Sequence, residues 1–142
     1  TYEKGIKELN SCFDSMGIRT KNNSIESASG LSRETRISAS QLTSILIKAV
    51  NDFSIGPELL VSLGLFGEDG TVKDRDIDPD QKGNIRVKTG RLNGVDALSG
   101  YIKTKSSKLM AFSIIANGFK DKERDSYRAL QNRLIDYIFN NL

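Results

Sequence analysis

Apolar side chains recur along the first 16 residues at the spacing of one helix face. They are separated by four, three, four and three positions: Tyr2, Ile6, Leu9, Phe13 and Met16. This period predicts an amphipathic helix, which Gly17 ends because glycine readily adopts the left-handed conformation that follows many helices. The sole cysteine, Cys12, lies within the same pattern, so we expect a buried thiol with no internal disulfide partner.

A polar stretch over residues 20–36 predicts a loop between that helix and a second apolar pattern. Ser38 and Gln41 then form a Ser-x-x-Gln capping box, which indicates the start of a helix. Apolar residues follow at helical spacing: Leu42, Ile45, Leu46, Ala49 and Val50. A shorter helix at about Pro57–Leu63 is predicted next, since proline is favoured in a first helical turn.

A charged loop over residues 67–84 leads into three apolar segments with the composition of β-strands. The predicted strands are Ile85–Thr89, Val95–Thr104 and Leu109–Asn117. Asn93-Gly94 and the Ser106-Ser107 region mark turns between them, so an antiparallel meander is predicted. Such a sheet has two open edges, which indicates that something else pairs with it.

The chain ends in a predicted helix at about Arg124–Asn140. We expect its apolar stripe to cover the sheet through these residues: Tyr127, Leu130, Leu134 and Ile138. The predicted fold class is therefore α+β, a three-stranded antiparallel sheet with flanking helices.

Length and composition indicate one globular domain with a modest core. The chain has 142 residues, of which 37% are hydrophobic and 27% charged. No apolar run is long enough for a membrane-spanning helix. The 21 basic and 18 acidic residues are spread along the chain rather than gathered on one element, so we expect no nucleic-acid partner.

The absence of histidine excludes several kinds of chemistry within these residues. A Ser-His-Asp triad, a Cys-His pair and a histidine-ligated zinc all need an imidazole. Asp74, Asp76 and Asp78 resemble the opening of a calcium loop, but Pro79 and Ile85 stand where that loop needs glycine and glutamate. We therefore expect no metal and no cofactor.

The strongest chemical candidate is Lys88-Thr89-Gly90, at the end of the first predicted strand. A lysine cation can hold a carboxylate, and a threonine hydroxyl adds a directional donor to the same group. Glycine lets a substrate backbone approach the strand without an intervening side chain. Because successive side chains of a strand point to opposite faces, Lys88 and Thr89 serve one cleft only if the strand lies at an exposed edge.

Four segments, in order, resemble one known family over nearly all of the chain. They are SGLSRETRISASQL (29–42), SLGLFGEDGTVKDR (62–75), VKTGRLNGVDALSGYI (87–102) and MAFSIIANGF (110–119). The chain is thus similar to the C-terminal part of the D-alanyl-D-alanine carboxypeptidase/endopeptidases, the class C low-molecular-mass penicillin-binding proteins. The resemblance implies a segment, residues 1–142, of a DD-peptidase/β-lactamase-like fold.

The resemblance also implies roles for particular residues. Lys88 and Thr89 would hold the terminal carboxylate of the substrate beside Gly90, and the backbone N–H of Arg91 would be an oxyanion-hole donor. The family's nucleophile motif Ser-x-x-Lys and its Ser-x-Asn motif are both absent from these residues, so no catalytic residue is expected here. In the family both motifs lie upstream of the Gly-Leu-Ser-Arg segment. The isolated chain is therefore expected to be inactive.

Two departures from the family pattern affect these expectations. Ser27-Ala28 stands where the family has Asp-Gly, which weakens any role carried over to that loop. Arg91 stands where threonine is usual, which keeps the backbone donor but alters the charge beside the carboxylate site.

By resemblance, the parent protein is a bacterial, extracytoplasmic enzyme that acts on peptidoglycan stem peptides ending in D-Ala-D-Ala and is acylated by β-lactams. Its expected partners are those peptides, β-lactams and the missing N-terminal part of the same protein, with self-association through an open sheet edge in the isolated chain. Two alternative hypotheses stay open. In the first, the chain is a non-catalytic peptide-binding or structural module. In the second, Thr1 is an N-terminal nucleophile whose own amine acts as base.

Overall fold

The computed structural model describes residues 1–18 and 24–142. Its helices are α1 (Tyr2–Ser15), α2 (Ala39–Val50), α3 (Gly56–Ser62) and α4 (Arg124–Asn141), and its strands are β1 (Gly64–Leu65), β2 (Ile85–Leu92), β3 (Val95–Lys103) and β4 (Leu109–Asn117). Three short 3₁₀ helices are η1 (Gly70–Val72), η2 (Pro79–Gln81) and η3 (Asp121–Glu123). The predicted helices and strands are all found, within a few residues of their expected bounds. Of the predicted loop over residues 20–36, positions 20–23 lie outside the described residues.

The sheet has four antiparallel strands in the order β1-β2-β3-β4, not the three that the sequence predicted. The additional strand β1 pairs Gly64 with Val87 and Leu65 with Arg86. With only two residues it is too short to show an alternating pattern in the sequence. The long hairpins β2–β3 and β3–β4 form the predicted meander.

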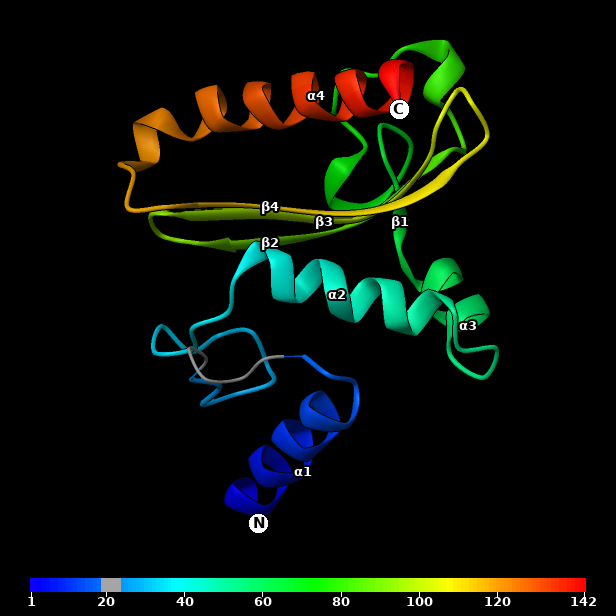
Figure 1. Cartoon of the computed structure of the whole chain (residues 1–142). Helices are drawn as coiled ribbons and strands as arrows, with labels where there is room; N and C mark the ends of the chain where they lie inside the picture. The colour runs from blue at the N-terminus through cyan, green and yellow to red at the C-terminus, as the bar shows by residue number, and fades with distance from the viewer. Residues whose placement is uncertain (19–23) are drawn as a thin grey trace.

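Helices cover both faces of this sheet (Figure 1). α4 lies along one face, α2 lies along the other, and α1 stands on the far side of α2 from the sheet. The start of α2 is fixed as predicted, because the Ser38 hydroxyl accepts from the Gln41 N–H and the Gln41 side chain accepts from the Ser38 N–H. α2 is also anchored to the sheet by the Tyr101 hydroxyl of β3, which donates to the Leu46 carbonyl at 2.8 Å.

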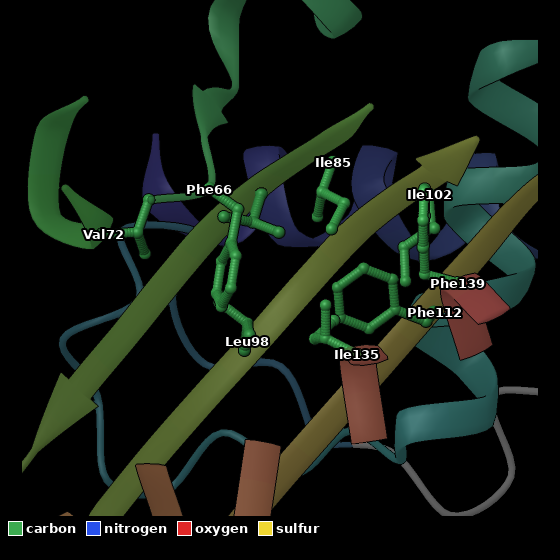
Figure 2. Close-up of a cluster of buried hydrophobic side chains, with 9 residues drawn as sticks. Phe66, Val72, Ile85, Leu98, Ile102, Phe112, Ile135 and Phe139 are labelled. Carbon is green, nitrogen blue, oxygen red and sulfur yellow. The ribbon is translucent and has the colours of Figure 1, made fainter. Parts of the chain in front are cut away.

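The core lies between the sheet and α4. Figure 2 shows its side chains, which come from the strands β2, β3 and β4, from the segment after β1 and from α4. They are Phe66, Val72, Ile85, Val87, Leu98, Ile102, Phe112, Ile135 and Phe139. Phe66 directly follows β1 and Val72 lies in the charged loop, so burial of these two side chains holds the start of that loop against the sheet.

The expected apolar stripe of α4 was wrong in part. Leu130 and Leu134 are exposed, whereas Gln131, Ile135 and Phe139 are buried. The buried face is rotated because Gln131 has polar partners inside the molecule. Its side chain donates to Asp96 at 3.0 Å and accepts from Arg75 at 2.8 Å, so this glutamine is buried without losing hydrogen bonds.

The expectation that Cys12 is buried was also wrong, since its thiol is exposed. α1 packs on the rest of the described chain mainly through Phe13, its one buried residue. The helix is amphipathic as predicted, but the described chain leaves Tyr2 exposed and covers Ile6, Leu9 and Met16 only in part. Among the described residues, no helix is long and apolar enough to cross a membrane.

Candidate active-site wall

The Lys-Thr-Gly triplet lies on a free edge of the sheet. β1 pairs with β2 only at Arg86 and Val87, so on that side residues 88–92 face no other strand within the described parts of the chain. On the other side the whole of β2 pairs with β3, from Ile85 opposite Ile102 to Leu92 opposite Val95. The triplet therefore lies at an exposed strand edge, as the alternation of Lys88 and Thr89 required, and a second chain segment or a substrate can approach it there.

Lys88 and Thr89 point to opposite faces of this edge. Lys88 pairs with Ser99 on the face towards α2, whereas Thr89 pairs with the fully buried Leu98 on the face towards α4. The exposed Lys88 ammonium curls back along its own strand and donates to the Thr89 carbonyl at 2.7 Å. Both polar ends thus lie close to the strand edge rather than deep under either helix.

The hydroxyl of Thr89 has a partner that the sequence did not predict. Its Oγ1 lies 2.7 Å from Oγ1 of Thr71, which is 18 residues earlier in the chain and belongs to η1. The segment that carries Thr71 was part of the family resemblance, but its contact with the triplet depends on how the loop folds.

Gly90 is exposed and has room for a side chain. A methyl group at this position would meet only the Ala97 side chain, at 3.5 Å, an ordinary van der Waals contact. Neither packing nor a left-handed backbone therefore requires glycine here. A close approach by something outside the described chain would require it.

A buried carboxylate lies behind the end of β2. Asp96, opposite Arg91 in the β2–β3 pair, is almost fully buried and bonds to Arg124 at 3.1 Å and to Gln131 at 3.0 Å. The Arg91 side chain is about half exposed, at 55%, and its Nε is 3.8 Å from Asp96. Its guanidinium thus lies beside the free edge within ion-pair distance of Asp96.

Arginines hold the turn between β2 and β3. Arg124 donates to the carbonyls of Leu92 and Val95, each at 3.0 Å, on the two sides of the turn. Its guanidinium also lies over the Phe119 ring, 5.2 Å from the centroid, and hydrogen bonding to Asp121 and Asp96 raises its pKa above the ordinary value. The same interaction with Arg124 lowers the pKa of the Asp121 carboxyl.

A third contact reaches this turn from the Gly-Leu-Ser-Arg segment. Arg33 donates to the Asn93 carbonyl at 3.1 Å, so that segment reaches the turn that follows β2 although Arg33 lies 60 positions before Asn93 in the chain. Lys88, Arg91 and Arg33 bring cationic side chains to this end of β2, where Asp96 pairs with Arg91 and Arg124. A carboxylate is the kind of ligand that such a surface attracts.

Other expected features are placed elsewhere. Within residues 1–18 and 24–142, no group of three or more acidic or cysteine side chains is arranged to hold a metal ion. Asp78, one of the aspartates of the calcium-like pattern, instead caps η2 by accepting from the Asp80 N–H at 3.1 Å. Thr1 is exposed at the start of α1.

A groove on the surface lies along α1 and not at the triplet. Its lining includes Tyr2, Ile6 and Asn10 of the helix and Ile25 of the following loop. The lining mixes the apolar side chains of Tyr2, Ile6 and Ile25 with charged ones from Glu3, Lys7, Asp14 and Glu26, and it includes no residue of the triplet.

Comparison with known proteins places this geometry in a family. The sequence profile described as the D-Ala-D-Ala carboxypeptidase 3 (S13) family matches residues 1–136. The chain is 29% identical over 135 residues to carboxypeptidase DacB of Mycolicibacterium smegmatis, covering 92% of this chain and 29% of that protein. It is 29% identical over 129 residues to D-alanyl-D-alanine carboxypeptidase DacB of Haemophilus influenzae, covering 89% of this chain and 26% of that protein.

A solved structure shares the fold. Penicillin binding protein 4 of Haemophilus influenzae, crystallised in complex with a novel β-lactam, superimposes with a TM-score of 0.85 at 25% sequence identity. The match covers 98% of this chain and 33% of that protein. The chain therefore spans less than a third of the length of the curated relatives named above and about a third of this solved structure.

Proposed function

Since the chain belongs to the D-Ala-D-Ala carboxypeptidase 3 (S13) family, we propose that it supplies the Lys-Thr-Gly wall of a serine-type D-Ala-D-Ala carboxypeptidase active site. The observation that carries this proposal is the position of the triplet. Lys88, Thr89 and Gly90 lie on a strand edge that no other strand of the described residues covers, near a turn held by arginines. The relatives are carboxypeptidases, which supports an enzymatic parent protein.

In the proposed reaction, the parent's nucleophilic serine lies outside these 142 residues. Its oxygen attacks the carbonyl of the penultimate D-Ala, the bond to the terminal D-Ala breaks, and the serine proton passes to the leaving amine. Water then cleaves the acyl-serine ester and regenerates the hydroxyl. During both steps the Arg91 backbone N–H stabilises the oxyanion, and Lys88 with Thr89 holds the terminal carboxylate before it leaves.

The substrate class follows from the same chemistry. We propose peptidoglycan stem peptides ending in D-Ala-D-Ala, and β-lactams as acylating analogues, with an extracytoplasmic site of action. The β-lactam complex of the Haemophilus influenzae structure supports the second of these ligands.

The remainder of the active site, in this proposal, belongs to another part of the same protein. Large apolar side chains on and between α2 and α3 support such a covering partner, because they are exposed: Ile47, Phe53, Ile55 and Val61. Phe53 is 93% exposed and Val61 is 77% exposed, the largest exposed fractions of the four.

The test is release of D-Ala from a peptide ending in D-Ala-D-Ala by the complete gene product in which these residues lie. We expect Lys88→Ala to lower kcat/KM by roughly 100-fold or more, because the cation that holds the carboxylate is lost. Arg91→Ala should cost much less, since the backbone N–H stays. No D-Ala release by the unaltered gene product would overturn the proposal.

A non-catalytic binding module is the second candidate, because the exposed strand edge at Lys88 could hold a peptide carboxylate without a nucleophile. In that case the same edge holds a peptide carboxylate without turnover. Binding of a D-Ala-D-Ala peptide to the complete gene product, abolished by Lys88→Ala but never followed by D-Ala release, would identify this function.

A further inference from the structure

The two threonine hydroxyls at the free edge are joined over a large sequence distance. Oγ1 of Thr71 and Oγ1 of Thr89 lie 2.7 Å apart, a normal hydrogen-bond length for two hydroxyls. Thr71 is exposed and Thr89 is only partly buried, so the pair stands at the surface beside the triplet. Burial of polar groups therefore does not require this hydrogen bond.

The loop that presents Thr71 is fixed without help from its hydroxyl. The Asp69 carboxylate accepts from the Leu65 N–H at 2.8 Å, and Gly67 donates to the Val72 carbonyl at 3.0 Å. Val72, next to Thr71, is 98% buried in the core. Two hydrogen bonds and one buried apolar side chain thus set the position of η1, so the Thr71 hydroxyl is available for a role other than holding the loop.

A hydroxyl carries one proton, and that limits what Thr89 can do. If Thr89 donates its proton to Thr71, only its lone pairs face a carboxylate, and these repel it. If Thr71 donates to Thr89, the Thr89 proton points away from Thr71 and is available to a carboxylate oxygen. A carboxylate ligand therefore selects the second arrangement, in which the hydrogen bonds run from Thr71 to Thr89 to the ligand.

We propose that Thr71 is a positioning residue for recognition of the substrate's terminal carboxylate, acting by donating its proton to the Thr89 hydroxyl. This inference rests on the proposed function, because it assumes that Thr89 binds that carboxylate. It extends the recognition site from β2 to η1, so the loop after β1 takes part in substrate specificity.

The experiment compares Thr71→Val, Thr71→Ser and the unaltered complete gene product, with steady-state release of D-Ala as the readout. Valine has the shape of threonine without the hydroxyl, and serine keeps the hydroxyl. We expect Thr71→Val to raise KM roughly 3- to 10-fold with little change in kcat, because the contact is made in both ground and transition states. Thr71→Ser should stay close to the unaltered protein.

Thr43→Val is the matched control, since the Thr43 hydroxyl donates to the Ala39 carbonyl within its own helix at 2.9 Å. It should leave KM unchanged. A peptide with an amidated C-terminus adds a second readout, and Thr71→Val should not weaken it further because no carboxylate is present. A loss of activity that reflected misfolding would affect both peptides and would not be rescued by serine.

The two proposals fail in different ways. If the unaltered gene product releases D-Ala and Thr71→Val has the same KM, Thr71 has no positioning role and the proposed function stands. A fall in kcat for both peptides in Thr71→Val and Thr71→Ser alike would also contradict the positioning role. If the unaltered gene product releases no D-Ala, the proposed function fails, and the carboxylate role of Thr71 fails with it.

Discussion

Gly90 and Gly100 lie in adjacent strands, yet a methyl group would meet different surroundings at each. At Gly90 the nearest neighbour is the Ala97 side chain at 3.5 Å. At Gly100 the methyl group would overlap the Arg86 carbonyl oxygen and lie 2.8 Å from the Val87 Cα atom. Packing therefore explains the glycine at position 100, whereas packing does not require the one at position 90, where the proposed function expects a substrate to approach.

This difference predicts that Gly90→Ala separates folding from function. Its free energy of unfolding should change by less than about 1 kcal/mol, since the added methyl group makes an ordinary contact at an exposed site. D-Ala release by the complete gene product should fall at least about 10-fold, because the methyl group stands where the substrate backbone approaches. Thermal melting and steady-state kinetics on the same preparation measure both quantities.

Gly100→Ala is the contrasting variant. We expect it to lose the folded state or melt far below the unaltered protein, since the backbone of β2 would have to move. A Gly90→Ala protein with full activity would show that no substrate approaches that strand closely.

The sequence predicts those parts of the site whose residues are adjacent in the chain, but not the contacts between distant segments. Lys88, Thr89 and Gly90 are consecutive, so the triplet and its place at a strand end can be found from the residues alone. The Thr71–Thr89 bond and the contact from Arg33 to Asn93 join distant segments, and only the folded loops bring them together. The edge position of β2 likewise depends on how short β1 is, which no periodic pattern reveals.

At the scale of elements, α4 shows why an apolar pattern can predict a helix and misplace its buried face. The sequence offers two candidate stripes, and the one with more leucine is exposed. The structure buries the other because Gln131 bridges Asp96 and Arg75, whose guanidinium also donates to Asn132 of α4 at 2.8 Å. Burial lowers the pKa of Arg75, but these partners satisfy its two terminal nitrogens.

The rotated face of α4 predicts unequal effects for two neighbouring residues. Ile135 is fully buried in the core, and Leu134 is 38% exposed. Ile135→Ala should lower the free energy of unfolding by roughly 2–5 kcal/mol, since it removes buried apolar area and leaves a cavity. Leu134→Ala should cost less than about 1 kcal/mol. Equilibrium unfolding in urea of the 142-residue chain distinguishes the two, and equal losses would contradict the observed packing.

For the molecule as a whole, the far edge of the sheet is exposed as well. Within the described parts of the chain, β4 pairs only with β3. Its sequence, Leu109–Asn117, has seven apolar residues and no charge, and such an edge readily accepts another strand. α2 and α4 lie on opposite faces of the same sheet, so an added strand would extend a layer that is already covered on both sides (Figure 1).

We therefore expect the isolated 142-residue chain to self-associate through β4. Its mass by light scattering should rise with concentration, and the outward-facing amides of β4 should exchange more slowly with deuterium at high concentration. The β2 edge near Lys88 should show a smaller change, because its charged side chains disfavour strand addition. A strictly monomeric chain at every concentration would show that the open edge does not pair.

The central claim is that these residues form one wall of a serine-type active site whose nucleophile lies elsewhere in the same protein. The most direct measurement is the intact mass of the complete gene product, and of the isolated chain, after incubation with a penicillin. We predict one penicillin adduct on the complete gene product, at a serine outside residues 1–142, formed more slowly in Lys88→Ala. The isolated chain should gain no mass. An adduct on a residue within the chain, or none on the complete gene product, would contradict this claim.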